Sequence, residues 1–266
     1  MNDTHYRIVP FPKMRLLVVD AMRAAAHKPM IHGLIEVDVT VPRQRLRAQR
    51  EKTGAAFSFT AFLIYCLGQA LEQEPVVNAY RNWRGQLVLF TDADISTIIE
   101  TDTPQGKFPQ AHVLRRVNRR TLQDIHDEMR AIQQQGFEHI QKMPLRALRL
   151  FLALPGFVRL AVYRIIMLRP QWFKQAVGTV GVTAVGMFGT GAGWGISFPL
   201  YNLNLVVGGI AQKPAVIDGH IVAREILNLT LSFDHVVIDG APAARFAAHL
   251  KQLIESGFGL PDTAAS

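Results

Sequence analysis

The sequence has little cysteine, no apolar run at its N-terminus and no linker of low complexity. Its one cysteine, Cys66, excludes a disulfide framework and argues against a cysteine-based metal site. Because Cys66 stands within the apolar run 62–67, we expect a buried core thiol, and we predict no metal site. Residues 1–7 show no signal peptide, so a cytoplasmic location is the default expectation.

Acidic residues are fewer than basic ones, 21 against 29, and the formal net charge is +8. Much of the excess lies in residues 43–47, in residues 115–120, and in five arginines between Arg146 and Arg169. The chain has no helix-turn-helix, zinc-finger or aromatic-basic surface motif, so we expect no nucleic-acid partner. An anionic partner explains the charge: coenzyme phosphates, a membrane surface or an acidic protein. Ordinary surface basicity explains it equally.

The stretch from Gln175 to Gln212 has no charged residue, and nine of its residues are glycine. Its length suits a bilayer, but glycine, asparagine and proline recur too often for a membrane helix. The apolar runs Val177 to Val185 and Leu203 to Val207 instead predict central strands that are buried on both faces. The glycine-rich piece 186–195 is predicted as a loop. It is not a phosphate-binding loop, because no Gly-Lys-Ser/Thr follows it.

The stretch from Pro144 to Phe173 has no acidic residue, while arginines punctuate its apolar residues. Pro155-Gly156 divides it into two short, basic, amphipathic helices, and neither is long enough to span a membrane. One interpretation is a surface helix pair that contacts anionic lipid or a partner. The other is a helical hairpin that covers its own core or a neighbouring subunit.

The remaining chain alternates between helical and strand patterns. An apolar fraction of 49% is ample for a core, and no repeat or boundary is visible, so one α/β domain over residues 1–266 is predicted. The expected elements are helices at 14–28, 42–52, 58–74 and from Thr121 onward, a strand at 35–39, and hairpin strands within 76–100.

The stretch 227–241 reads as a strand that turns abruptly into a helix. Leucines and Phe233 alternate with polar residues up to Ser232, and then Asp234 and His235 appear, with Asp239-Gly240 four residues on. The chain has eight other histidines. His235 differs from them because it stands at a strand end between two aspartates, where rigid backbone can present a base to a cavity.

A histidine in this position can activate a thiol. With reference pKa values near 6.5 and 8.5, moving the thiol proton to imidazole costs roughly 2.7 kcal/mol. A hydroxyl group is harder to activate. Acyl transfer also requires a donor for the oxyanion of the tetrahedral intermediate.

The pattern Asp234-His-x-x-x-Asp239-Gly resembles the active-site motif of the catalytic domain of the 2-oxoacid dehydrogenase acyltransferase family. Residues 178–189, Gly-Thr-Val-Gly-Val-Thr-Ala-Val-Gly-Met-Phe-Gly, resemble a second segment of that family, whose oxyanion-stabilising hydroxyl falls on Thr183. Residues 35–40, 60–78 and 213–219 resemble further segments of it, in the same order.

The resemblance implies a chloramphenicol-acetyltransferase-like α/β sandwich with a mixed sheet, working as a homotrimer. His235 of one chain would face Thr183 of the next, and coenzyme A and the acceptor would enter a shared channel from opposite ends. His235 would deprotonate the attacking thiol, and Thr183 would stabilise the oxyanion. Asp239 would hold the histidine loop or tune its charge, and Asp234 would orient the turn.

The chain departs from the family pattern in several places. It has no lipoyl domain, so a lipoyl group would arrive on a separate protein. Val236 stands where the family usually has arginine, and Asn202-Leu-Asn204 replaces an Asn-Pro-Pro-Gln segment. The basic amphipathic segment at about 144–173 is an insertion. The tail 257–266 lacks the apolar end that joins trimers into cages, so an isolated trimer is expected.

Three functions are consistent with these residues. The first is an acyltransferase that moves an acyl group between coenzyme A and a thiol such as dihydrolipoyl. The second is coenzyme A-dependent acylation of a small hydroxyl or amine. The third is a catalytically inactive trimer that serves as a scaffold or a membrane-surface adaptor through residues 144–173.

Overall fold

The computed structural model describes residues 6–103, 106–135, 145–186 and 191–261. The helices in these ranges are α1 (Arg15–Ala25), α2 (Thr40–Thr53), α3 (Phe59–Gln73), α4 (Leu122–Gln135), α5 (Leu145–Ala153), α6 (Gly156–Met167), α7 (Pro170–Val177) and α8 (Gly240–Glu255), with short 3-10 turns η1 (Pro75–Asn78) and η2 (Val117–Arg119). The strands are β1 (Met30–Asp38), β2 (Ala79–Arg81), β3 (Leu87–Leu89), β4 (Ile95–Thr103), β5 (Gly106–Leu114), β6 (Val180–Ala184), β7 (Leu203–Ile217) and β8 (His220–Asp234).

Six strands form one mixed sheet in the order β1-β8-β7-β6-β4-β5, and β2 and β3 form a separate hairpin. Strand β6 runs parallel to both of its neighbours, β4 and β7. The pairs β1–β8, β7–β8 and β4–β5 are antiparallel. The mixed α/β sheet predicted from the sequence is therefore confirmed.

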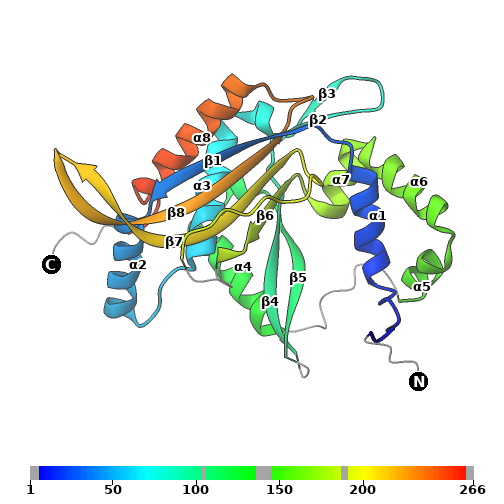
Figure 1. Ribbon diagram of the computed structural model, residues 1–266, viewed down its shortest axis with the longest axis horizontal. Coiled ribbons are helices and arrows are strands. Elements are labelled where there is room, and N and C mark those ends of the chain that lie inside the picture. The colour runs from blue at the N-terminus through cyan, green and yellow to red at the C-terminus, as the bar shows by residue number, and fades with distance from the viewer. Residues whose placement is uncertain (1–5, 104–105, 136–144, 187–190, 262–266) are drawn as a thin grey trace.

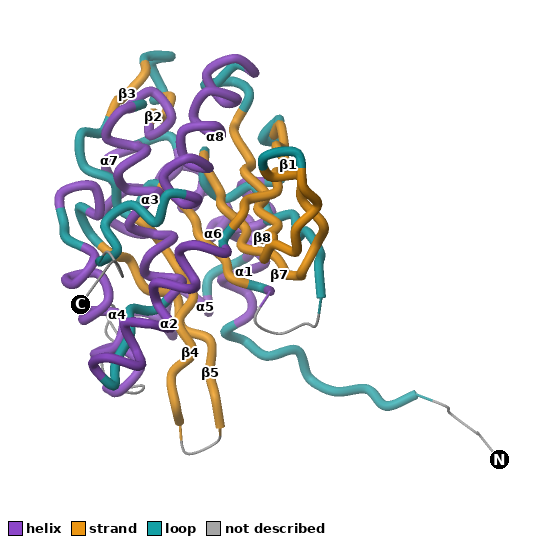
Figure 2. The backbone as a smooth tube through the Cα atoms, turned by 90° about the vertical axis from the view of Figure 1, so that its left-hand side faces the viewer, coloured by secondary structure: helices purple, strands orange, loops and turns teal. Residues whose placement is uncertain are grey.

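One face of this sheet forms the core with a layer of helices. Leucines at 227, 229 and 231 with Phe233 project from β8 onto this face and pack with buried residues of α3 and α8. Helix α3 is buried along most of its length, which fits its apolar composition. Figures 1 and 2 show α3, α4 and α8 together on one side of the strands. Cys66 lies in this layer as a buried thiol, as expected.

The far ends of β7 and β8 extend beyond the rest of the sheet. Strand β1 pairs with β8 only from Asp234 back to Ile226, so the hairpin between residues 213 and 225 has no further strand beside it. Figure 1 shows this hairpin projecting from the body. Its tip turns at Asp218-Gly219, both with positive φ, and its ribbon exposes apolar side chains such as Val216 and Ile221.

At the opposite end of the molecule, α5, α6 and α7 follow one another and α6 packs against α1 (Figure 1). The contact contains a buried ion pair, with Arg159 Nε 2.6 Å from Asp20 Oδ2. The chain breaks between α5 and α6 at Pro155-Gly156, as the sequence predicts.

Some local predictions were wrong. The strand expected from Val177 begins only at Val180, because α7 continues to Val177 and Gly178 (φ 87°) then reverses the backbone. Strand β7 runs ten residues past the predicted end at Val207, and β5 was not predicted. Parts of three predictions lie outside the described residues: Pro144 of the insertion, residues 187–190 of the glycine-rich loop, and residues 262–266 of the tail.

Candidate active site

The turn after β8 is held together by Asp234. Its main-chain oxygen accepts from the N–H groups of both Val237 and Ile238 at 3.0 Å, and its carboxylate accepts from the N–H of Val236 at 3.1 Å. A buried aspartate that bonds the backbone two residues on is a recurrent way to fix a tight turn. Asp234 therefore shapes the loop that carries His235.

Two main-chain bonds fasten this turn to neighbouring segments. The N–H of Asp234 donates to the carbonyl of Asn202 at 2.8 Å, and the N–H of His235 donates to the carbonyl of Pro29 at 2.8 Å. The turn thus has anchors on both the segment that precedes β7 and the segment that precedes β1. The histidine sits on backbone that three parts of the chain hold in place.

The ring of His235 has a defined tautomer. Its Nδ1 lies 3.0 Å from the carbonyl oxygen of Ile238, and a carbonyl can only accept, so Nδ1 carries the proton. In the neutral ring, Nε2 is then left with its lone pair. The His235 side chain is 46% exposed, so Nε2 is available to an incoming acid such as a thiol.

Asp239, the third member of the motif, does not hydrogen-bond the histidine. Its Oδ1 lies 3.9 Å from His235 Nδ1, and its side chain is 88% exposed. The residue occupies the N-cap position of α8, but its carboxylate makes no cap bond. Within one chain, the loop is held by Asp234 and by backbone, and Asp239 contributes a screened negative charge nearby.

Thr183 lies on the face of the sheet opposite the helix layer. It pairs with Val206 of β7, which pairs in turn with Thr230 of β8, so these three side chains share a face. Thr183 is half-buried. Within the described ranges no hydrogen bond is found to its hydroxyl group. A threonine hydroxyl can donate one hydrogen bond, so this group can donate to a ligand.

One protomer does not bring Thr183 and His235 together. Thr183 lies level with Thr230, two strands away, and His235 follows five residues further along β8. With strands about 4.8 Å apart and about 3.3 Å per residue, their Cα atoms are separated by on the order of 20 Å. Any chemistry that uses both residues needs a second protomer.

The sequence analysis missed Lys28. The Nζ of Lys28 donates to the carbonyl of Leu200 at 3.0 Å and to Oδ1 of Asn202 at 2.7 Å. Burial lowers the pKa of Lys28 from 10.5 to about 8, although the nearby Asp234 carboxylate raises it. A lysine between a helix and a strand gives no sequence signal of such contacts, since its partners lie more than 170 residues away.

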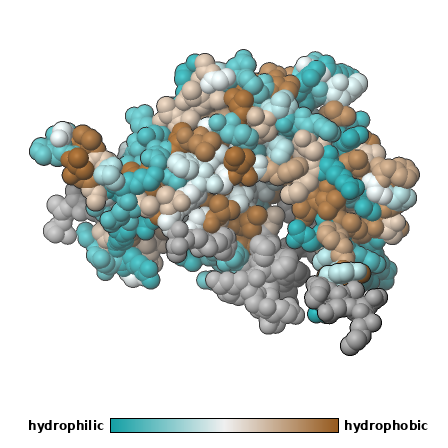
Figure 3. Space-filling view, viewed as in Figure 1, coloured by the Kyte–Doolittle hydropathy of each residue, from teal (hydrophilic) through white to brown (hydrophobic). Residues whose placement is uncertain are grey.

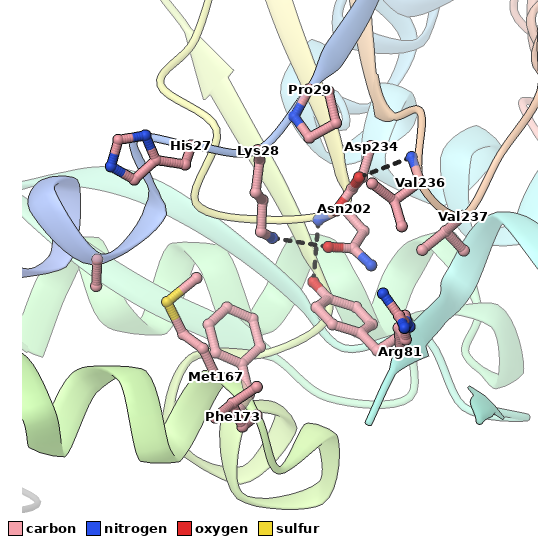
Figure 4. Close-up of a pocket in the computed structure, with 13 residues that line it drawn as sticks. His27, Lys28, Pro29, Arg81, Met167, Phe173, Asn202, Asp234, Val236 and Val237 are labelled. Carbon is pink, nitrogen blue, oxygen red and sulfur yellow. Dashed lines mark hydrogen bonds between the residues drawn. The ribbon is translucent and has the colours of Figure 1, made fainter. Parts of the chain in front are cut away.

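Beside this lysine is a cavity of about 310 Å³. Figure 4 shows Lys28 pointing toward Asn202, with Met167 and Phe173 on one side and Val236 and Val237 on the other. Tyr80 also lines the cavity, and its buried hydroxyl donates to the carbonyl of Thr179 at 2.6 Å. Because Asp234, Val236 and Val237 line it too, the cavity borders the turn that carries His235.

Among the described residues, some buried polar atoms on the Thr183 face have no hydrogen-bond partner. They are the hydroxyl of Thr230 and both polar atoms of the Asn228 side chain. Unpaired buried polar groups are costly, so each calls for an explanation such as a ligand or water. Asn228 and Thr230 lie two positions apart on β8 and thus share the Thr183 face.

The chain matches a known protein family over most of its length. The family model described as 2-oxoacid dehydrogenases acyltransferase (catalytic domain) matches residues 3–143 and 167–259, and passes over 144–166. The dihydrolipoyllysine-residue acetyltransferase component of the pyruvate dehydrogenase complex of Staphylococcus aureus is 26% identical over 250 residues, which are 92% of this chain. The chain spans about half the length of the curated relatives that it matches.

Solved structures share the fold. A probable dihydrolipoamide acetyltransferase from Listeria monocytogenes superposes with a TM-score of 0.71 at 21% identity, covering 98% of each chain. The truncated catalytic core of the 2-oxoacid dehydrogenase multienzyme complex from Thermoplasma acidophilum gives a TM-score of 0.65 at 23% identity, covering 95% of this chain and 100% of that one. The family resemblance predicted from the motifs is confirmed: the chain belongs to the 2-oxoacid dehydrogenase acyltransferase family, through its catalytic domain.

Proposed function

We propose that the chain transfers acyl groups between coenzyme A and a thiol, with dihydrolipoyl on a separate protein as the acceptor. The observation that carries the proposal is the bond from His235 Nδ1 to the carbonyl of Ile238, which leaves Nε2 as a base on a half-exposed ring. Membership in an acyltransferase family supports the same reaction.

In this reaction His235 acts first. Its Nε2 takes the proton of the acceptor thiol, and the thiolate attacks the thioester carbonyl of acyl-coenzyme A. The carbonyl oxygen of the tetrahedral intermediate gains a negative charge, and the hydroxyl of Thr183 from the neighbouring protomer donates to it. When the intermediate collapses, the coenzyme A sulfur leaves and recovers the proton from the imidazolium. The other ring proton stays on Nδ1 throughout and keeps its hydrogen bond to the carbonyl of Ile238.

The proposal requires a neighbouring protomer, as in the trimer that the family resemblance implies, and the projecting hairpin supports such an assembly. Val216 and Ile221 are 71% and 78% exposed on a two-stranded ribbon. Exposed apolar residues on an edge ribbon are typical of a surface that another chain covers.

The test is to incubate the protein with acetyl-coenzyme A and dihydrolipoamide and to separate free coenzyme A by chromatography. We expect His235→Ala to lower kcat roughly 10²- to 10⁴-fold, the usual contribution of a general base. We expect Thr183→Ala to lower it roughly 10²- to 10³-fold, and Thr183→Ser to retain most activity. The control is His249→Ala, a half-buried histidine on α8.

A panel of hydroxyl and amine acceptors distinguishes the alternatives. If the acyl group goes to a hydroxyl or amine but not to dihydrolipoamide, the proposed acceptor is wrong. The proposed roles of the catalytic residues would then still stand. If His235→Ala and the wild type give the same rates with every acceptor, the catalytic proposal is wrong. The remaining hypothesis is then a catalytically inactive scaffold.

A further inference from the structure

The segment formed by α5 and α6 lies almost entirely outside the match to the family model, which passes over residues 144–166. Buried contacts fix this segment to the rest of the fold. Arg159 of α6 is 7% exposed, donates to Asp20 of α1, and also donates to the carbonyl of Leu154 at 2.5 Å. The hydroxyl of Tyr163 donates to the carbonyl of Leu17 at 3.1 Å. The inner face of α6 is therefore fixed against α1.

The outer face of α6 is apolar where a soluble surface helix is polar. Phe157, Ile165 and Leu168 are 77%, 50% and 51% exposed, and their spacing of 8 and 3 residues places them along one side of the helix. Leu150 of α5 is 70% exposed. Figure 3 shows apolar side chains gathered at this end of the molecule, over α1 and α6. We call Leu150, Phe157, Ile165 and Leu168 the outer apolar face.

Basic residues surround the outer apolar face. Arg146, Arg149 and Arg164 are exposed, and within the described ranges none of them has an ion-pair partner. Arg169 stacks on the ring of Trp172, with its guanidinium carbon 4.4 Å from the ring centroid. The sequence has no aspartate or glutamate between residues 139 and 217. This surface is therefore both apolar and positively charged, without local neutralisation.

The lengths of the two helices suit a position at the interface between a membrane and water. In the described residues no single helix is long and apolar enough to cross a membrane, and α5 and α6 together meet that test only as a pair bent by 115°. The 12 residues of α6 rise about 18 Å, while the hydrocarbon core of a bilayer is about 30 Å thick. Such a helix can lie in the headgroup region with its apolar side inward.

We propose that the outer apolar face and its arginines dock on the surface of an anionic lipid membrane. Anionic headgroups complement the unpaired arginines, and acyl chains accept the apolar side chains. A second copy of the same face would bring like charges together, so self-association through it is disfavoured. Leu168 also lines the cavity beside the His235 turn, so docking would bring that cavity close to the bilayer surface.

The test measures sedimentation of the purified protein with vesicles of phosphatidylcholine alone or mixed equally with phosphatidylglycerol. We expect binding to the mixed vesicles, weakened by salt. The pair Arg149→Gln and Arg164→Gln should lower the partition constant roughly 30-fold, at about 1 kcal/mol per arginine. The pair Phe157→Ser and Ile165→Ser should lower it at least about tenfold.

Matched controls are exposed residues far from this face. Arg50→Gln with Lys52→Gln on α2, at the other end of the molecule (Figure 1), should bind as the wild type does. Circular dichroism and sedimentation velocity establish that each variant keeps its fold and assembly. No binding of wild type to mixed vesicles, equal binding to both vesicle types, or equal losses in the controls would each overturn the proposal. So would dissociation of the protein's own oligomer by Phe157→Ser and Ile165→Ser, which would assign the face to a second copy.

Discussion

Two aspartates flank His235, and the structure gives them unequal roles. Asp234 is buried and accepts the N–H of Val236, whereas Asp239 is exposed and lies 3.9 Å from the ring. The motif alone does not distinguish them, because both stand within four residues of the histidine. The distinction comes from the sheet, which ends at Asp234 and turns its side chain inward.

We therefore predict that Asp234→Ala lowers the free energy of unfolding by about 1–3 kcal/mol, because the N–H of Val236 loses its acceptor. Asp239→Asn should change it by less than about 0.5 kcal/mol, as is usual for an exposed residue without bonds. Urea unfolding followed by circular dichroism measures both. The opposite ranking of the two variants would contradict the assignment.

At the residue scale, sequence reasoning located His235 and Thr183 by motif but could not supply their partners. The bond from His235 to Ile238 depends on how the turn closes. The contacts of Lys28 with Leu200 and Asn202 join segments far apart in the chain, which no local pattern encodes. In the sequence, Asn228 is only one of the polar residues that alternate with leucines along a strand, so the pattern did not show that its polar atoms lack partners.

Among the secondary-structure elements, α6 depends on one ion pair. Arg159 and Asp20 are 7% and 1% exposed, so removing one partner leaves a buried charge. We expect Arg159→Ala to lower the free energy of unfolding by about 3–5 kcal/mol. The double variant Asp20→Leu with Arg159→Met, which replaces the pair by apolar side chains, should recover most of that loss. Urea unfolding of the single and double variants checks this, and an unaffected single variant would show that the pair is not needed.

The junction of β4 with α7 should respond to acid. Burial raises the pKa of Asp94. Hydrogen bonds from the Arg116 N–H, Arg115 and Lys174 lower the pKa by more than burial raises it, so it lies below its ordinary value. A lowered folded-state pKa adds stability above the unfolded-state pKa of about 3.9, and this stability is lost as pH falls through the folded-state value.

We expect Asp94→Asn to be about 2 kcal/mol less stable than wild type at neutral pH. The difference should shrink below about pH 4, as the wild-type carboxyl takes up its proton. Urea unfolding of both proteins over this pH range measures it. A difference that stays constant with pH would show that the charge of Asp94 contributes nothing.

Element positions followed from the sequence wherever periodicity was long and unbroken. Helices α1, α2, α3 and α4 lie within a few residues of their predicted positions. Helical composition indicated α1, basic residues α2, an apolar stretch that ends at Pro75 α3, and an apolar face α4. The start of β6 was misplaced because the apolar run from Val177 has the same composition in the last turn of α7 and in the strand. The pattern cannot show where Gly178 reverses the chain.

For the whole molecule, the central claim is that the active site forms between protomers. Family membership and the fold are shown. In the proposed mechanism, the separation of Thr183 and His235 within one chain makes the assembly a condition for catalysis rather than an accessory to it. A resemblance in sequence implies the trimer, and the exposed apolar hairpin favours it.

The most direct measurement is the activity of hybrid trimers. His235→Ala and Thr183→Ala chains carrying different affinity tags are co-expressed, and trimers containing both are isolated by successive purification. In a closed ring of three, one junction joins an intact His235 to an intact Thr183, so activity should return to about one third of wild type. Each variant alone should stay inactive. Hybrid trimers as inactive as the two parents would contradict a site shared between protomers.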